Sequence, residues 1–157
     1  VFDTPSYFKD INRYHQIIHE TDLANNFNEY YKKNKKKLSN YMQKAIANGN
    51  KYSAKDYAEA IDFMKRSYES YKEVFEDYHG VLSPSSPGVA PKGLKSTGTA
   101  EFNKYWSFMG TPCISLPLLQ GENNLPLGVQ LVGDKYDDLR FLSTARWLEQ
   151  KSKGFYE

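Results

Sequence analysis

Three short apolar segments in the second half of the chain constrain the fold more than any other feature of the sequence. Val81–Ser83, Cys113–Leu116 and Leu127–Val132 are each typical of a β-strand, and the last is apolar enough to be central in a sheet. Two or three strands cannot form a stable sheet with both faces covered. We therefore expect further strands beside them, and these 157 residues do not encode those strands.

The first half of the sequence is predicted to be helical. A helix should begin at the Thr4-Pro5 pair, since proline at the first helical position loses no needed hydrogen bond. Apolar residues at helical spacing carry this helix to about Glu29. The basic run at 30–37 is then predicted to be a solvated connector.

Two further helices follow. A short one over 39–47 would end in a left-handed cap at Gly49. A long one begins at Ser53 and Asp56, which form an approximate capping box. Its apolar positions alternate in steps of four and three, which favours a helix packed on its own domain and leaves a coiled coil with a partner as the alternative. These positions are Tyr57, Ile61, Met64, Tyr68, Tyr71, Phe75 and Tyr78.

After Gly80 the sequence changes in character. Residues 84–98 are rich in proline, glycine and serine and should form a loop. Thr99 is predicted to cap a helix that runs to Met109 and ends at Gly110. Asp137 and Asp138 favour the start of a final helix. That helix is predicted to bury Leu139, Leu142, Ala145 and Leu148.

The sequence thus divides into a mainly helical segment, 1–78, and a segment of strand, loop, helix, two strands and helix, 79–157. The net charge of +2 is too small to imply a nucleic-acid or membrane partner. No apolar run approaches the roughly 20 residues of a membrane span, and the first residues do not resemble a signal peptide. We expect a cytoplasmic location.

Several residues are candidates for metal binding, nucleic-acid binding or nucleophilic catalysis, and each also fits a purely structural role. His15 and His19 lie four apart on a predicted helix, but no third ligand is near in sequence, so we predict no metal site. The lysines at 32–37 lack the arginines and aromatic residues of a nucleic-acid site and are expected to be a solvated face. Cys113, the single cysteine, is predicted to be a small buried side chain. No cofactor site is predicted.

The segment from Ser96 to Trp106 has two interpretations. It combines a flexible loop with a helix start, which offers free backbone donors, and with apolar residues. This mixture suits a pocket wall, and it equally suits an ordinary loop followed by a buried helix.

The order of several motifs resembles the carboxyl-terminal part of the amidase signature family, whose members are serine hydrolases that cleave amide bonds. The resemblance extends over most of the chain, from Arg13–Asn25 to the last helix. The motifs that carry it are His79–Pro91, Ser96–Gly98, Phe102, Asn103, Trp106, Gly110–Pro117 and Leu125–Gly133.

The resemblance implies an α/β fold in which helices pack on a few strands of a mixed sheet, as one part of a larger single domain. It also implies catalysis by a serine nucleophile, a second serine and a lysine, a variant of the general triad logic. None of these three positions has a match here, so no catalytic residue is assigned to this chain. The residues that match the substrate-pocket wall are Thr97, Gly98, Phe102, Asn103 and Trp106.

The leading hypothesis is therefore the carboxyl-terminal portion of an amidase, inactive alone. Its expected partners are a small amide substrate and the amino-terminal portion of the enzyme, and an oligomer is compatible with the sequence. One alternative is a subunit of a tRNA-dependent amidotransferase, although Ser107–Pro112 differs from the form usual there. Others are a helical module that binds a partner through its tyrosine stripe, and a basic RNA-binding accessory protein.

Overall fold

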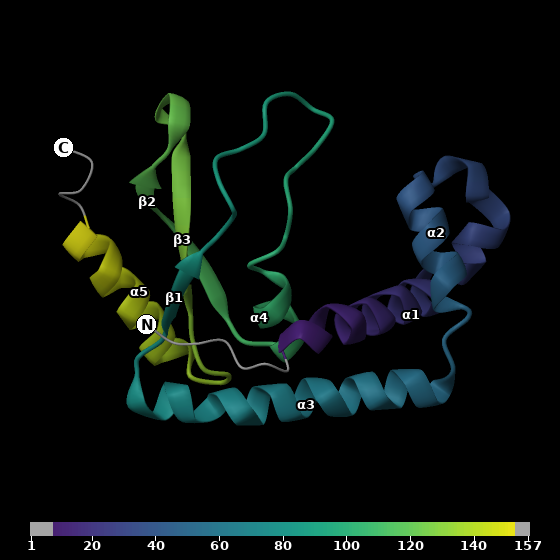
Figure 1. The fold of residues 1–157 in the computed structure, drawn as a ribbon, viewed down its shortest axis with the longest axis horizontal. Helices are drawn as coiled ribbons and strands as arrows, with labels where there is room; N and C mark the ends of the chain where they lie inside the picture. Colours follow the sequence, from purple (N-terminus) through teal and green to yellow (C-terminus); the bar gives the residue numbers. More distant parts are fainter. Residues whose placement is uncertain (1–7, 153–157) are drawn as a thin grey trace. The chain divides into compact units, whose positions relative to one another are not determined.

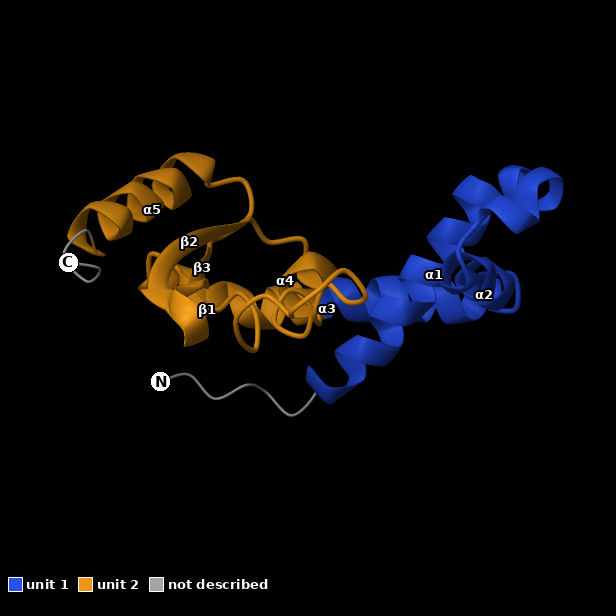
Figure 2. Ribbon diagram, turned by 90° about the horizontal axis from the view of Figure 1, so that it is seen from above, with its two compact units in different colours: residues 1–66 blue, residues 67–157 orange. Residues whose placement is uncertain are grey.

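The computed structural model describes residues 8–152 and divides the chain into two compact units, 1–66 and 67–157, coloured separately in Figure 2. Helix α3 (Ala54–Asp77) runs through the boundary between them. The expected division of the sequence at 78/79 stays a prediction. The Thr4-Pro5 helix start lies outside the described residues.

Unit 1 contains α1 (Phe8–Asn34), a 3₁₀ turn η1 (Lys35–Lys37) and α2 (Asn40–Gly49) (Figure 1). Helix α1 runs past Glu29, so the predicted connector was wrong over its first five residues, 30–34. The lysines of this run are exposed, as predicted. They extend the helix or its 3₁₀ turn because lysine is a good helix former when its side chain stays in water.

A buried carboxylate joins α1 to the chain that follows. Glu20 is only 7% exposed. Its Oε2 accepts a hydrogen bond from the Tyr52 hydroxyl at 2.9 Å, and its Oε1 accepts from the side-chain amides of Gln16 and Asn48, each at 3.2 Å. A buried carboxylate is costly unless it is hydrogen-bonded, and three donors meet that need here.

Helix α2 begins as predicted and ends differently. The Ser39 hydroxyl accepts from the backbone amide of Met42 and caps the helix. Gly49 was predicted to be a left-handed cap, and this was wrong, because it is the last helical residue and Asn50 caps in a right-handed conformation. Glycine is needed at 49 for space instead, since a Cβ there would overlap the backbone carbonyl of Glu20.

The capping box at the start of α3 is confirmed. The Asp56 amide donates to the Ser53 hydroxyl at 3.1 Å, and the Asp56 carboxylate accepts from the Ser53 amide at 2.8 Å. The Ser53 hydroxyl also donates to the carboxylate at 2.7 Å. These bonds from Ser53 lower the pKa of Asp56, since they favour its charged form.

The aromatic stripe of α3 packs within the chain, as favoured from the sequence. In unit 1 the Tyr57 hydroxyl donates to the Asp22 carboxylate at 3.0 Å. In unit 2 Tyr71 and Phe75 are buried, and their rings lie 5.9 Å apart. Only the last member, Tyr78, is largely exposed among the seven.

Unit 2 is built on an antiparallel sheet of β1 (Val81–Pro84), β2 (Cys113–Gln120) and β3 (Pro126–Val132), with β3 in the centre as predicted (Figure 1). Val132 faces Val81 on one side and Cys113 on the other. The pairing of β2 is irregular between Leu116 and Leu119, around Pro117, which has no backbone donor for the ladder. Within the described residues, β1 and β2 each pair with β3 alone.

Helix α5 (Asp138–Ser152) covers one face of the sheet. Phe141 and Ala145 pack there against Leu131, with Ile114 beside them. The prediction that Leu139 and Leu142 would be buried was wrong, since they are 81% and 55% exposed. Helical spacing fits more than one rotation of the helix, and the bulky Phe141 side chain sets the buried face. Ala145 is buried as predicted, and Leu148 is half-buried.

Helix α4 (Lys104–Met109) is shorter than predicted. Thr99 lies in an exposed stretch and does not begin the helix, which starts after a turn closed by the Asn103 and Lys104 amides on the Ala100 carbonyl, both at 3.0 Å. The end at Gly110 is confirmed, because this residue has a φ of 70° in the left-handed region.

The contact between Gly49 and Glu20 gives a testable prediction. Replacing Gly49 by alanine should lower the free energy of unfolding by about 1–3 kcal/mol, because two helices would be forced apart. Chemical denaturation measures this. Gly88→Ala is the matched control, since nothing lies within 4 Å of an added Cβ there. Equal stability of the two variants would contradict the close approach.

Candidate functional site

The five residues predicted to line a pocket lie on two kinds of structure. Thr97 and Gly98 belong to an exposed loop. Gly98 has a φ of 87°, a left-handed conformation that favours glycine, and its amide donates to the Ser96 hydroxyl at 3.1 Å. Its Cα faces Pro91, so the two arms of the loop approach each other here.

Phe102, Asn103 and Trp106 lie on the turn that enters α4 and on α4 itself. Phe102 is half-buried. The Asn103 side chain is exposed and makes no capping hydrogen bond, while its carbonyl accepts from the Ser107 amide at 3.0 Å. Asn103 therefore offers a polar group to solvent from a position that its backbone fixes.

Trp106 is a core residue of unit 2. It is only 6% exposed, and its ring meets Tyr71 edge to face, with centroids 5.4 Å apart at 73°. Its carbonyl accepts from both the amide and the hydroxyl of Thr111, at 3.1 and 3.3 Å. These contacts anchor α4 in the core and make it a rigid base for the residues before it.

One buried amide joins this region to the sheet. Gln130 of β3 is 4% exposed, and its side chain lies on the sheet face opposite Leu131. Its Nε2 donates to the Ser83 hydroxyl at 2.8 Å and to the carbonyls of Pro84 at 3.1 Å and Phe102 at 3.0 Å. Gln130 was not predicted from the sequence to have a role. Its only mark in the sequence is a lone polar side chain within an apolar strand.

The same face carries a pair of serines. Ser85 and Ser115 hydroxyls lie 2.7 Å apart above Gly128, where an added Cβ would collide with both oxygens. The face that points away from α5 thus carries hydroxyls and a buried amide beside apolar residues such as Val132, which is fully buried there. A serine bonded to another hydroxyl is not by that bond an activated nucleophile, since activation needs a base.

Cys113, the first residue of β2, was predicted to be buried, and this was wrong because the residue is exposed. Partial burial of the thiol nevertheless raises its pKa to about 11. At neutral pH the group is a thiol, which is the unreactive form.

A small network lies near the end of α4. Asp134 accepts from the Tyr68 hydroxyl at 2.7 Å and from the Lys135 amide at 2.8 Å, and the Lys135 ammonium lies 3.9 Å from the centre of the Tyr68 ring. Burial and then the bond to Asp134 raise the pKa of Tyr68 to about 12, and burial lowers the pKa of Lys135. A hollow of about 330 Å³ beside them is lined by Gly110, Thr111, Pro112, Lys135, Tyr136 and Asp138.

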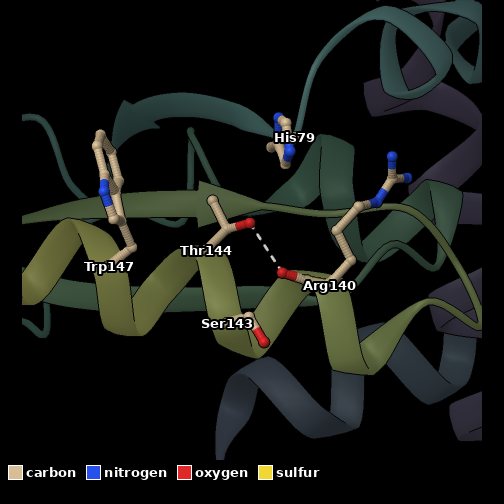
Figure 3. A pocket seen from close by; sticks show the side chains of 5 residues that line it. All are labelled: His79, Arg140, Ser143, Thr144 and Trp147. Atoms are coloured by element: carbon tan, nitrogen blue, oxygen red, sulfur yellow. Dashed lines mark hydrogen bonds between the residues drawn. The ribbon is translucent and has the colours of Figure 1, made fainter.

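A larger hollow, of about 520 Å³, lies along α5 (Figure 3). Four of its residues are on that helix, Arg140, Ser143, Thr144 and Trp147, and His79 faces them from the segment before β1. Arg140 is already engaged, by Asp137 at 2.7 Å and by the Phe75 carbonyl at 3.2 Å. Neither hollow is lined by any of the five predicted wall residues.

The histidines of unit 1 described by the structure are engaged with neighbouring side chains. His19 contacts the Tyr41 hydroxyl at 3.2 Å, and its ring stacks on that of His15. Within residues 8–152 no group of three or more histidine, cysteine, aspartate or glutamate side chains is placed to hold a metal ion. None of the helices in that range combines the length and apolar composition of a membrane span.

Comparison with known proteins identifies the family. The family model described as Amidase matches residues 4–142. The chain belongs to the amidase family. This agrees with the resemblance to amidase signature enzymes that the motifs between His79 and Gly133 carry.

Similar proteins within the amidase family are longer than this chain. A glutamyl-tRNA(Gln) amidotransferase subunit of Alkaliphilus metalliredigens is 33% identical over 109 residues, which is 64% of this chain and 22% of that protein. The protein of the same name from Halothermothrix orenii is 35% identical over 88 residues, 52% of this chain and 18% of that protein. The chain therefore spans about a fifth of these relatives.

Solved structures confirm the fold. A crystal structure described as an amidase superposes with a TM-score of 0.79 at 20% identity and covers 92% of this chain and 36% of that one. A 6-aminohexanoate cyclic dimer hydrolase gives a TM-score of 0.68 at 16% identity, covering 88% of this chain and 34% of its own. The predicted α/β architecture, part of the amidase-signature fold, is confirmed.

The raised pKa of Cys113 gives a prediction about its reactivity. At pH 7.5 the folded chain should react with iodoacetamide roughly 100-fold more slowly than the same chain unfolded in urea, because so little thiolate is present. The rate should rise with pH towards about 11. Since Cys113 is the single cysteine, the unfolded chain is its own control. Equal rates in the two states would contradict the shift.

Proposed function

We propose that this chain is the carboxyl-terminal portion of an amide-bond hydrolase and is not catalytic alone. The observation that carries this is the amidase superposition, which covers nearly all of this chain and about a third of the amidase. The serine nucleophile, the bridging serine and the lysine of the family have no match in this sequence. The proposal assigns them to the amino-terminal portion of the enzyme.

The sheet supports this division of roles. β1 and β2 pair with β3 alone within the described residues, and Leu82 of β1 is 54% exposed on the same face that α5 covers elsewhere. An apolar strand that is incompletely covered favours association with further strands and helices. We assign those elements to the amino-terminal portion.

The wall of the substrate pocket is proposed to comprise Thr97, Gly98, Phe102, Asn103 and Trp106. An exposed loop that leads into a rigid helix, with a buried amide of the sheet at its base, fits a site that holds a small polar substrate. The substrate is proposed to be a small amide. Trp106 would act mainly by holding α4, since it is buried against Tyr71.

The remaining features stay predictions of the sequence. A cytoplasmic location, the absence of a cofactor and the absence of nucleic-acid or membrane partners follow from composition and motifs. An oligomer is compatible with the fold.

A second candidate function is amide transfer. Two of the relatives that match are named as glutamyl-tRNA(Gln) amidotransferase subunits, and they are 33% and 35% identical over 109 and 88 residues. Both reactions release ammonia from an amide donor as an acyl-enzyme forms; in hydrolysis the ammonia is set free, and in amide transfer it is passed to the carboxyl group of an acceptor. Assay of the complete protein for free ammonia, with and without glutamyl-tRNA as acceptor, separates the two.

The helical interaction module is the weaker alternative. It requires an available tyrosine stripe, whereas Tyr71 and Phe75 are buried in unit 2. The basic accessory alternative would show RNA binding that falls steeply with salt.

The division of roles predicts that the purified chain hydrolyses no simple amide. The complete enzyme should hydrolyse amides and should lose this activity to a serine-directed inhibitor. Release of ammonia measures both. Amide hydrolysis by the chain alone, sensitive to that inhibitor, would show that a nucleophile lies within these residues.

The pocket wall predicts a kinetic effect for Asn103→Ala in the complete enzyme. The Michaelis constant should rise about fivefold or more, which corresponds to about 1 kcal/mol of lost substrate binding. Stability should change by less than about 0.5 kcal/mol, since the side chain is exposed. Asn25→Ala on the exposed side of α1 is the control. Equal Michaelis constants in both variants would remove Asn103 from the wall.

A further inference from the structure

We propose that Gln130 is a positioning residue that closes the pocket-wall loop at its base and so sets the affinity for substrate; this rests on the proposed function. The loop is defined as residues 85–101. Pro84 precedes it directly and Phe102 follows it directly, and the single side-chain amide of Gln130 donates to the carbonyls of both.

The direction of these bonds is fixed by chemistry. The carbonyls of Pro84 and Phe102 can only accept, so the nitrogen of the amide must face them. A flipped amide would place its oxygen against two carbonyl oxygens. The Ser83 hydroxyl, 2.8 Å from the same nitrogen, can rotate to suit, so it is the adaptable member of the set.

Few other bonds hold the loop. Every residue from 90 to 101 is exposed. The Ser85 amide donates to the Gly128 carbonyl at 3.0 Å, and the Asn103 and Lys104 amides donate to Ala100 at the other end. The first arm also meets the sheet, since the Ser85 hydroxyl lies 2.7 Å from that of Ser115 and Val89 lies against Gly121 at the end of β2. Residues 90–101 are closed locally, as at Gly98. Closing a flexible segment costs chain entropy, and bonds at its two ends offset that cost for the whole loop.

Because of its position, substitution of Gln130 should have a large effect on the loop. Gln130 is 4% exposed and lies in the central strand, so its replacement by an apolar residue leaves the carbonyls of Pro84 and Phe102 without this donor. The loop can then separate from the sheet while α4 stays anchored through Trp106 and Tyr71. Thr97 and Gly98 would then no longer be held at a fixed position relative to Asn103.

The test uses Gln130→Met in the complete enzyme, because methionine keeps the volume and removes the donors. Hydrogen exchange measured by mass spectrometry should be about tenfold or more faster at the Ser85, Asn103 and Lys104 amides and unchanged in α1 and α2. The Michaelis constant should rise about fivefold or more, with the turnover number within about twofold, since ground-state binding is what is lost.

Gln120→Met is the matched control. It is the same replacement in the same sheet, but Gln120 is exposed on β2 and its Nε2 donates to the Asn124 carbonyl at 3.4 Å. It should change neither exchange at the loop ends nor the Michaelis constant. Ser83→Ala should have a smaller effect than Gln130→Met, since both carbonyls keep their donor.

Several results would overturn the proposal. Unchanged exchange at the loop ends, or faster exchange spread evenly over the chain, would show that Gln130 does not act on the loop. A loss of turnover with no change in the Michaelis constant would place its effect elsewhere. If Gln130→Met fails to fold, a measurement on the unmodified protein tests the proposal. The side-chain amide protons of Gln130, observed by nitrogen-15 NMR, should exchange far more slowly than those of Gln120. Equal rates would refute the hydrogen bonds from Gln130 to the loop ends.

The exchange and kinetic results test the role of Gln130 and the proposed function separately. A complete enzyme that hydrolyses no amide would refute the proposed function, while the exchange data would still judge whether Gln130 holds the loop. An active enzyme in which Gln130→Met leaves loop exchange unchanged would refute the role of Gln130 and leave the proposed function standing.

Discussion

The pairing of β3 with both of its neighbours is the interaction on which unit 2 depends. Val132 at one end of β3 is fully buried between Val81 and Cys113. Because side chains alternate along a strand, β3 sends Leu131 to the face under α5 and Gln130 to the opposite face. One strand therefore supplies both the Leu131 side chain that packs under α5 and the Gln130 amide on the opposite face. A register slip of a single residue would exchange the two and leave an amide beneath Phe141.

This alternation explains why the two faces have different roles. The α5 face is closed by apolar packing of Phe141 and Ala145 on Leu131. The other face combines the buried Val132 with the buried amide of Gln130, whose hydrogen bonds are directional and hold the loop ends at defined positions. Apolar packing tolerates small shifts in position, whereas a buried amide bonded to two carbonyls does not. The face that carries Gln130 is thus the one suited to holding the two ends of the loop.

Local patterns in the sequence predicted the elements whose partners are near in sequence. The Ser53 and Asp56 capping box and the Gly110 stop each depend on residues within one turn, and each is confirmed. The rest depends on distant contacts. Gly49 is required by Glu20 from another helix, and the rotation of α5 is set by the sheet it covers. The Thr99 start was wrong because a turn at Ala100 intervenes, and the bonds of Gln130 join three segments that only the fold brings together.

The placement of the predicted wall residues has a consequence for how substrate range can change in such a fold. Trp106 is buried and its replacement by alanine would open a cavity, at a cost of about 3–5 kcal/mol. Residues 90–101 are exposed, so substitutions there cost little stability. If one buried amide holds both ends of the loop, its tip is free to vary without loss of the fold. Substrate specificity would then depend on the exposed residues of the loop, and stability on the buried residues Gln130 and Trp106.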